Sequence, residues 1–407
     1  MTETWALATL WLGLALAATL LSIWFRIATA LSEIVVGTVA QLIIGALMGG
    51  AILGTDQSWI KFLSGTGAIV LTFLAGAELD PVVFRAKWKE ASVVGLASFA
   101  MPFFGCSAVA FWLLHWSGQA SWLAGIAMST TSVAVVYAVM LELGLNNTNY
   151  GKTLLAACFV TDMGTVIALG LLFSPFTYKT LVFVLVLAVM GVVLPWLTPR
   201  FFKRYGNRPS EMEAKYLLLS LFGMGALALW AGSEAVLPAY MIGMVLAGTV
   251  GKDHALVRRL RTLTFGLLTP FYFIRAGSLV SVPSLLSAPL VFLVFLVTKV
   301  LFKFVAVLPA TQYFNRRNGA EPAHAKTESL YTTLLMSTGL TFGSIASLFG
   351  LTHEIIDTAQ YSYLVAAVIA SAVIPTVIAN AFYLPRHLLR ENNSPPEETP
   401  RVEPQQT

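Results

Sequence analysis

The stretch Ala156–Gly170 reads AACFVTDMGTVIALG and contains a single charged residue, Asp162. It lies within a longer apolar segment, about residues 153–173, which has roughly the 20 residues that a helix needs to cross a bilayer. A charge at that depth costs at least about 2.5–3.5 kcal/mol, so such residues normally face a bundle interior or a wet cavity and mark an ion or proton pathway. We therefore interpret Asp162 as an ion-binding residue. The alternative is a neutral aspartic acid that is hydrogen-bonded to a neighbouring helix.

The composition indicates the class of protein. Of 407 residues, 57% are hydrophobic and 11% are charged, whereas soluble domains carry about 25% charged residues. We therefore expect an all-α polytopic membrane protein that is surrounded by the lipid bilayer. The net charge of +5 does not predict nucleic-acid binding, because the basic residues fall in short loops. Both cysteines, Cys106 and Cys158, lie in apolar segments and are expected to pack rather than to pair.

Thirteen apolar runs are long enough to span a membrane. They lie at about residues 5–25, 32–54, 60–79, 91–115, 120–143, 153–173, 178–200, 213–232, 235–251, 262–281, 285–310, 328–350 and 359–384. Residues 1–385 are therefore treated as one transmembrane domain. Residues 386–407 are polar and rich in Pro and Glu, which predicts a short disordered cytoplasmic tail.

The basic residues predict the orientation. With thirteen spans, 20 of the 25 Lys and Arg residues fall in loops on the side of the C-terminus, and only Lys61 and Lys179 fall on the other side. Cytoplasmic loops carry an excess of Lys and Arg. We therefore expect a multi-pass protein of the cytoplasmic membrane, with its N-terminus outside and its C-terminus in the cytoplasm.

Three basic residues, Arg275, Lys299 and Lys303, remain within predicted spans. Lys299 is near the middle of its span, and we interpret it as a functional residue that compensates charge. Lys303 lies one turn nearer the cytoplasm on the same face. Arg275 lies in the outer half of its span. For Arg275 and Lys303 a functional role and simple snorkelling towards the membrane surface are both open.

Two spans contain residues that tolerate a helix break. The fifth has four consecutive hydroxyl residues at Ser129–Ser132, and the twelfth reads STGLTFG at Ser337–Gly343, with Thr338, Gly339, Thr341 and Gly343. These spans correspond if the chain consists of two six-helix repeats on either side of the seventh span, inverted relative to each other. Transporters often build ion sites from helices that are interrupted at matching positions. The alternative is that small and hydroxylated residues only allow close helix packing. The two repeats also share a weak sequence similarity, FLAG at Phe73–Gly76 and FIRAG at Phe273–Gly277.

Four ordered motifs resemble those of a known family. They are FLAGAELDP (Phe73–Pro81), STTSVAVVY (Ser129–Tyr137), the segment around Thr161 and Asp162, and TKVLFKF (Thr298–Phe304). The chain resembles the monovalent cation:proton antiporters of the second superfamily branch. The resemblance implies a homodimer, two crossed discontinuous helices, and a core domain (helices within about 60–173 and 262–384) beside a scaffold. It also implies that Asp162 binds the metal ion, that Thr130 and Thr131 belong to the unwound crossing, and that Lys299 is the intramembrane lysine.

Two departures from the family pattern bear on mechanism. Electrogenic members have two adjacent aspartates, and here the first position is Thr161, so we expect electroneutral exchange. Potassium efflux systems continue into a large nucleotide-binding domain, and here a short tail follows, so gating by nucleotide or glutathione is not expected.

These observations predict an antiporter that exchanges a proton for Na⁺ or K⁺ by alternating access, with no cofactor besides the transported ions. Asp162 would bind either ion, with oxygen ligands from Thr161, Thr130, Thr131 and Ser132. Lys299 is expected to contact Asp162 in the cation-free state, with Arg275 as the next candidate. The main alternative is a cation channel or leak pathway that uses the same site. An intramembrane enzyme is not expected, because no HExxH motif, paired intramembrane Asp or Ser/His pair lies at bilayer depth.

Overall fold

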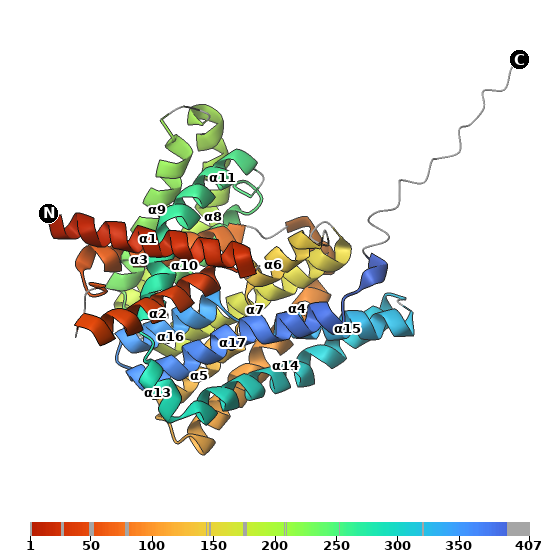
Figure 1. The fold of residues 1–407 in the computed structure, drawn as a ribbon. Coiled ribbons are helices and arrows are strands. Elements are labelled where there is room, and N and C mark those ends of the chain that lie inside the picture. The colour runs from red at the N-terminus through yellow and green to blue at the C-terminus, as the bar shows by residue number, and fades with distance from the viewer. Residues whose placement is uncertain are drawn as a thin grey trace, which may run out of the picture.

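The computed structural model describes residues 2–25, 28–48, 53–77, 81–143, 145, 148–173, 177–206, 208, 210–251, 253–319 and 321–388. Within these ranges the secondary structure is helical (Figure 1). The first half contains α1 (Thr2–Phe25), α2 (Thr29–Met48), α3 (Ser58–Ala77), α4 (Pro81–Ala108), the π-helix η1 (Val109–Leu113), α5 (Gly118–Ser129), α6 (Val133–Glu142) and α7 (Asn149–Phe173). The second half contains α8 (Tyr178–Tyr205), α9 (Met212–Trp230), α10 (Val236–Leu246), α11 (His254–Leu263), the π-helix η3 (Thr264–Leu268), α12 (Thr269–Ser278), α13 (Val282–Ser287), α14 (Pro289–Arg317), α15 (Pro322–Met336), α16 (Thr341–Thr352) and α17 (Thr358–Phe382).

Each of the thirteen predicted spans corresponds to a helix or a pair of helices. In the described part of the chain, nine helical stretches are long and apolar enough to cross a membrane, and α2 and α10 are shorter apolar helices. The remaining two spans are the broken pair α5 and α6 and the continuous run of η3 and α12. The predicted fold class is therefore confirmed.

The two predicted repeats are recognisable in how the helices pack. The packing of α3 on α10 is matched by the packing of α12 on α2, and each of these pairs joins one helix of the first half to one helix of the second. Both contacts depend on glycine: a Cβ atom on Gly76 would lie 2.5 Å from the carbonyl oxygen of Tyr240, and one on Gly277 would lie 2.0 Å from that of Ile34. Small residues allow this close approach. The similar FLAG and FIRAG motifs therefore lie at equivalent helix contacts in the two repeats.

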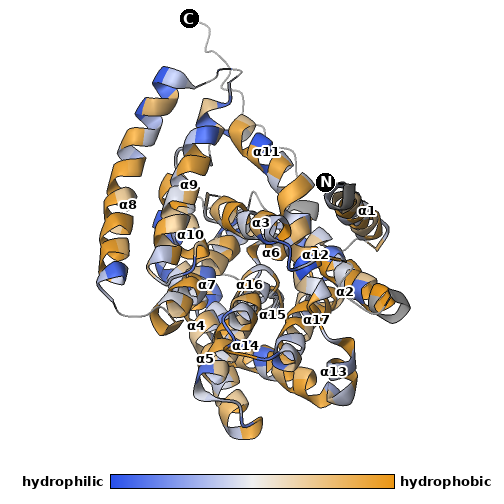
Figure 2. Cartoon of the chain, turned by 90° about the vertical axis from the view of Figure 1, so that its left-hand side faces the viewer, coloured by the Kyte–Doolittle hydropathy of each residue, from blue (hydrophilic) through white to orange (hydrophobic). Residues whose placement is uncertain are grey.

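The apolar contacts divide the helices into groups. The largest cluster of buried residues is centred on α4–α7 and α14–α17 and also includes residues of α2, α3, α10 and α12. Two smaller clusters join α3 to α8–α11, and α1 and α2 to α12. α3 packs most extensively on α10, and α12 packs most extensively on α2; the division into core and scaffold stays a prediction. Figure 1 shows α8, α9 and α11 projecting away from α14 and α15. Figure 2 shows α8 at the edge of the molecule, apolar along most of its length.

Long-range polar contacts show which loops share an end of the molecule. Arg259 of α11 is 3.0 Å from Glu211, just before α9, and Asn318, just after α14, donates to Glu90 of α4 at 3.3 Å. All four residues belong to loops or helix ends on the side that the basic residues assign to the cytoplasm. Each of these contacts therefore joins two segments that the thirteen-span topology places on the same side.

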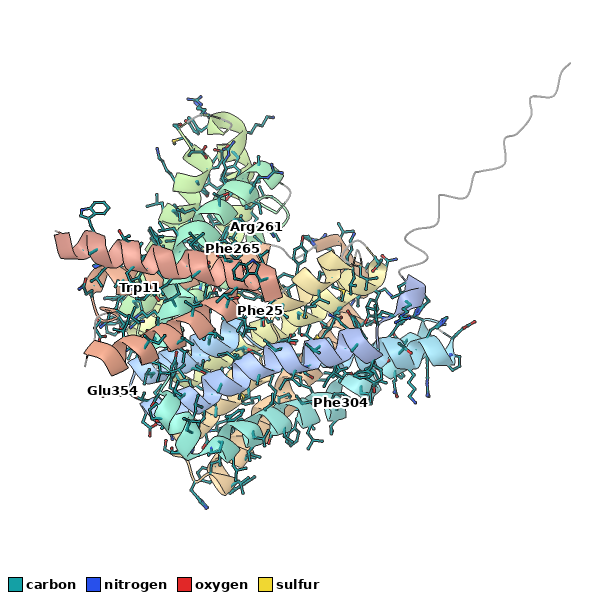
Figure 3. All side chains as sticks on the ribbon, in the orientation of Figure 1. Trp11, Phe25, Arg261, Phe265, Phe304 and Glu354 are labelled. Carbon is teal, nitrogen blue, oxygen red and sulfur yellow. The ribbon has the colours of Figure 1, made fainter. Side chains whose placement is uncertain are left out.

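The chain ends are tied to the bundle to different extents. Trp11 of α1 is buried, donates to the carbonyl of Leu53 at 2.8 Å and stacks on Phe271 of α12 (Figure 3). At the other end, His387 Nε2 is 2.7 Å from Oε1 of Glu328 on α15. The predicted disordered tail thus begins with three helical residues, 386–388, and the rest of it, 389–407, lies outside the described residues.

Candidate functional site

Both predicted helix breaks are present. The first separates α5 from α6 at Thr130–Ser132, where Thr130 has φ −62° and ψ 151°, an extended conformation. The second separates α15 from α16 at residues 337–340, where Leu340 has φ −145° and ψ −68°. A break of this kind releases backbone carbonyl and amide groups from the helical ladder. Both breaks therefore supply polar groups in the interior of the bundle.

The two breaks contact each other directly. The amide of Ser132 donates to the carbonyl of Thr338 at 3.1 Å. The hydroxyl of Thr131 donates to the carbonyl of Met336 at 2.8 Å. All of these residues are almost completely buried. The predicted crossing of two discontinuous helices is therefore an observed feature of the fold.

Glycine is required where the second break meets the first. A Cβ atom on Gly339 would lie 2.1 Å from Nζ of Lys299 and 2.8 Å from Oγ1 of Thr130, which is closer than Cβ atoms approach other atoms. A Cβ atom on Gly343 would lie 3.1 Å from the same Thr130 oxygen. The site therefore has no room for side chains at these two positions. Thr341 begins α16 beside them.

Asp162 projects from the middle of α7 and has 1% of its surface exposed. Its Oδ1 atom is buried and has no hydrogen-bond partner within the described part of the chain. A buried charged group without a partner is strongly unfavourable. The carboxylate is therefore available to bind a proton or a cation.

The neighbouring Thr161 is held differently. Its hydroxyl donates to the carbonyl of Gly95 on α4 and to that of Ala157, both at 3.1 Å. These bonds fix α7 against α4 but leave the hydroxyl oxygen with accepting capacity. Thr161 is thus adjacent to Asp162 and oriented by α4.

The two lysines of α14 lie at the crossing and are both fully buried. Asp162 interacts electrostatically with both lysines, more strongly with Lys303 than with Lys299. The predicted close contact between Lys299 and Asp162 is not formed: Nζ of Lys299 has no hydrogen-bond partner among the residues that the structure describes. Lys303 instead donates to three oxygen atoms. The two lysines therefore have different surroundings, although they lie one turn apart on the same face of α14.

Arg275 is not brought to Asp162. Its Nε donates to the carbonyl of Thr55 at 3.0 Å, in the loop between α2 and α3. It also interacts electrostatically with Asp56 of the same loop. It makes no ion pair with Asp162, and both residues are described. The next-candidate role that we assigned to Arg275 therefore has no structural support here.

Tyr240 of α10 closes the site on the side of the other helix group. It is fully buried, its hydroxyl donates to the carbonyl of Phe159 at 3.0 Å, and its ring packs edge-on against Phe342 of α16 at 5.5 Å. Nothing in the sequence singles out Tyr240, because its role depends on packing between distant helices.

A polar cavity approaches the site from the end of the bundle that carries the basic loops. It has a volume of about 190 Å³ and is lined by α4, α7, α14 and α15 and by Leu388. Glu90, Asn318 and Glu328 lie along it, and it reaches Ala157, whose carbonyl accepts from Thr161. The cavity thus reaches a residue that precedes Asp162 by about one and a half turns of α7.

The fold and this site define a class of protein: a polytopic helical membrane protein with two crossed, broken helices around one buried carboxylate. Comparison with known proteins identifies the family. Residues 14–382 match the family described as sodium/hydrogen exchanger, transmembrane, and the chain belongs to this family, whose members are transporters.

Individual relatives and a solved structure agree with this assignment. The chain is 26% identical over 372 residues to a Na⁺/H⁺ antiporter of Enterococcus hirae, covering 84% of this chain and 91% of that protein. It is 25% identical over 383 residues to the probable Na⁺/H⁺ antiporter 3 of Methanocaldococcus jannaschii, covering 89% and 95%. The fold matches that of the sodium proton antiporter MjNhaP1 from Methanocaldococcus jannaschii at pH 8 with a TM-score of 0.67 and 16% identity, covering 96% of this chain and 99% of the other.

Proposed function

We propose that this protein is a secondary active antiporter that exchanges Na⁺ or K⁺ for a proton across the cytoplasmic membrane. The observation that carries the proposal is the Asp162 carboxylate, which is buried at the helix crossing with one oxygen unpartnered. A proton or a monovalent cation would each neutralise it, and one carboxylate cannot hold both. Binding of one ion therefore requires release of the other, which couples the two fluxes.

The hydroxyl and carbonyl groups of the breaks supply further oxygen ligands. Thr130, Thr131 and Ser132 come from the first break, and Thr338 comes from the second. Hard monovalent cations prefer such oxygen atoms, and freed carbonyls at helix breaks coordinate Na⁺ in transporters. We assign cation binding to Asp162 with these oxygens, and a hydroxyl contribution from Thr161.

The burial of the site supports alternating access. Asp162 is shielded on one side by Tyr240, while the polar cavity ends near Ala157 on the other. A carrier must close the site on both sides between exposures, whereas a channel keeps a continuous path. In the proposed cycle the group α4–α7 and α14–α17 moves as the core against the remaining helices.

Two further features of the assembly are proposed with this function. The N-terminus lies outside and the C-terminus in the cytoplasm. The distribution of Lys and Arg supports this orientation. The protein forms a homodimer, as the family resemblance implies, and cross-linking in native membranes would test this.

The test is ion flux in proteoliposomes that enclose a pH-sensitive dye. An imposed outward Na⁺ or K⁺ gradient should drive protons inward against their own gradient in wild type, and Asp162→Asn should abolish this movement. A channel would instead let the cation pass without uphill proton movement. That result in the wild-type protein would overturn the proposal.

A further inference from the structure

The two buried lysines of α14 differ in their hydrogen bonds. Lys303 Nζ donates to Oγ of Ser98 at 2.7 Å, to the carbonyl of Ser129 at 2.9 Å and to Oγ1 of Thr131 at 2.9 Å. Lys299, one turn away, has no partner for its Nζ in the described residues. An ammonium group has three donors. Those of Lys303 are therefore all used, and those of Lys299 are not.

The oxygens around Lys303 come from two helices and the first break. Ser98 belongs to α4, Ser129 is the last residue of α5, and Thr131 lies within the break. The carbonyl of Ser129 has lost its helical partner because α5 ends there. A lysine near a helix C-terminus can bind such a carbonyl and interacts favourably with the negative end of the helix dipole. Lys303 therefore caps α5 in the interior of the bundle.

The same contacts reach the second broken helix. Thr131 accepts from Lys303 and uses its own hydroxyl proton to donate to the carbonyl of Met336 at 2.8 Å. One chain of hydrogen bonds thus runs from α14 through the first break to the end of α15. All three N–H groups of the Lys303 ammonium group have acceptors, so its side chain is held in one position. Lys299, in contrast, lies against Gly339, just before the positive N-terminal end of α16, where the helix dipole disfavours an ammonium group.

We propose that Lys303 is a positioning residue for cation binding. Its side chain fills an oxygen cage formed by Ser98, Ser129 and Thr131 as a fixed internal cation, and this holds the crossing in the geometry that binds the transported ion. The inference rests on the proposed function and adds to it a residue that acts through Thr131 rather than by touching the ion. It also separates the roles of the two lysines, because only Lys303 is fixed.

The test compares Lys303→Met with Ser98→Ala. Lys303→Met removes the whole cage contact, and Ser98→Ala removes one oxygen of three while leaving the lysine. The control is Ser347→Ala on α16, which is equally buried but donates only to its own helix at Gly343. Each variant is measured for the half-saturating Na⁺ and K⁺ concentration, the maximal exchange rate, and the rise in melting temperature caused by NaCl or KCl relative to choline chloride.

We expect Lys303→Met to raise the half-saturating concentration about tenfold, which is the size expected when a hydrogen bond to a charged group is lost, with less than a twofold change in maximal rate. Ser98→Ala should raise it less, and the double variant should nearly match Lys303→Met, because the 2.7 Å contact of Ser98 is to the lysine and its contact to Oγ1 of Thr131 is longer, at 3.5 Å. The salt-induced rise in melting temperature should shrink in the same order, since ligand binding stabilises by mass action.

Other outcomes would overturn the inference. A lower melting temperature with unchanged half-saturation would leave Lys303 a merely structural residue. A fall in the half-saturating concentration would show that its charge repels the ion rather than positions the site. If Lys303→Met does not fold, Ser98→Ala alone decides the question. An unchanged half-saturating Na⁺ and K⁺ concentration in Ser98→Ala would then refute the positioning role of Lys303. If wild type itself shows no exchange, the proposed function fails, and the salt-dependent melting of the variants still tests the cage.

Discussion

Replacement of Gly339 by alanine tests whether the crossing has the geometry described above. The new Cβ atom would lie 2.1 Å from Nζ of Lys299, 2.8 Å from Oγ1 of Thr130 and 3.3 Å from the carbonyl oxygen of Thr130. The lysine tip can move, but the backbone of Thr130 is fixed in the first break. Overpacking of this kind costs about 1–3 kcal/mol. We therefore expect Gly339→Ala to lower the melting temperature in detergent by several degrees.

The same change should reduce exchange more than stability. A displaced Thr130 moves a proposed cation ligand, and an error of about 1 Å at a site can cost about a hundredfold in rate. The matched control is Gly191→Ala on α8, where a Cβ atom meets nothing within 4 Å and alanine is the better helix former by about 1 kcal/mol. Gly191→Ala should melt no earlier than wild type and exchange at the wild-type rate. If the two variants behaved alike in both assays, the close approach of the breaks would be refuted.

Three other predictions concern charge and orientation. Exchange should be electroneutral, because Asp162 carries one proton and the Thr161 hydroxyl carries none at physiological pH; a robust transport current on a supported membrane would contradict this. Burial raises the pKa of Glu234, in the segment between α9 and α10, and nearby His353 opposes this shift. The folded protein therefore holds the carboxyl proton of Glu234 more tightly than the unfolded chain does. The free energy of unfolding accordingly falls as pH rises from the unfolded-state pKa of Glu234 towards its folded-state pKa. Glu234→Gln should flatten the dependence of melting temperature on pH above about 4.5, the ordinary pKa of a glutamic acid side chain, and an unchanged slope would count against it. Finally, Arg208→Cys should react with a membrane-impermeant maleimide only from the cytoplasm and Lys179→Cys only from outside, while native Cys106 and Cys158 are buried; reversed labelling would overturn the helix count.

The sequence was sufficient for the features that bilayer physics dictates. The apolar runs predicted the spans because the hydrocarbon core demands a helix of about 20 residues. The hydroxyl run at Ser129–Ser132 and the glycines at Gly339 and Gly343 predicted the breaks, because few other residues tolerate exposed backbone groups there. Asp162 stood out because a charge at that depth is costly.

The sequence was not sufficient for what depends on contacts between distant helices. The sequence favoured Lys299 as the partner of Asp162 because of its depth. In the structure neither lysine hydrogen-bonds Asp162, and Lys303 donates to oxygens of Ser98, Ser129 and Thr131. The difference arises where α5 ends, since this places the Ser129 carbonyl beside Lys303. Arg275 was the next candidate partner, but it donates to the carbonyl of Thr55 in the loop between α2 and α3. Tyr240 gave no signal, because an apolar span has no polar face to show which side meets a neighbour.

The central claim is that Asp162 binds either a proton or a cation, and proton release measures this most directly. Purified protein in weakly buffered detergent solution would receive NaCl or KCl, with choline chloride as the control, while a pH indicator reports released protons. Wild type should release up to about one proton per chain, because one carboxylate titrates, and Asp162→Asn should release none. Equal proton release by Asp162→Asn and wild type would contradict the account.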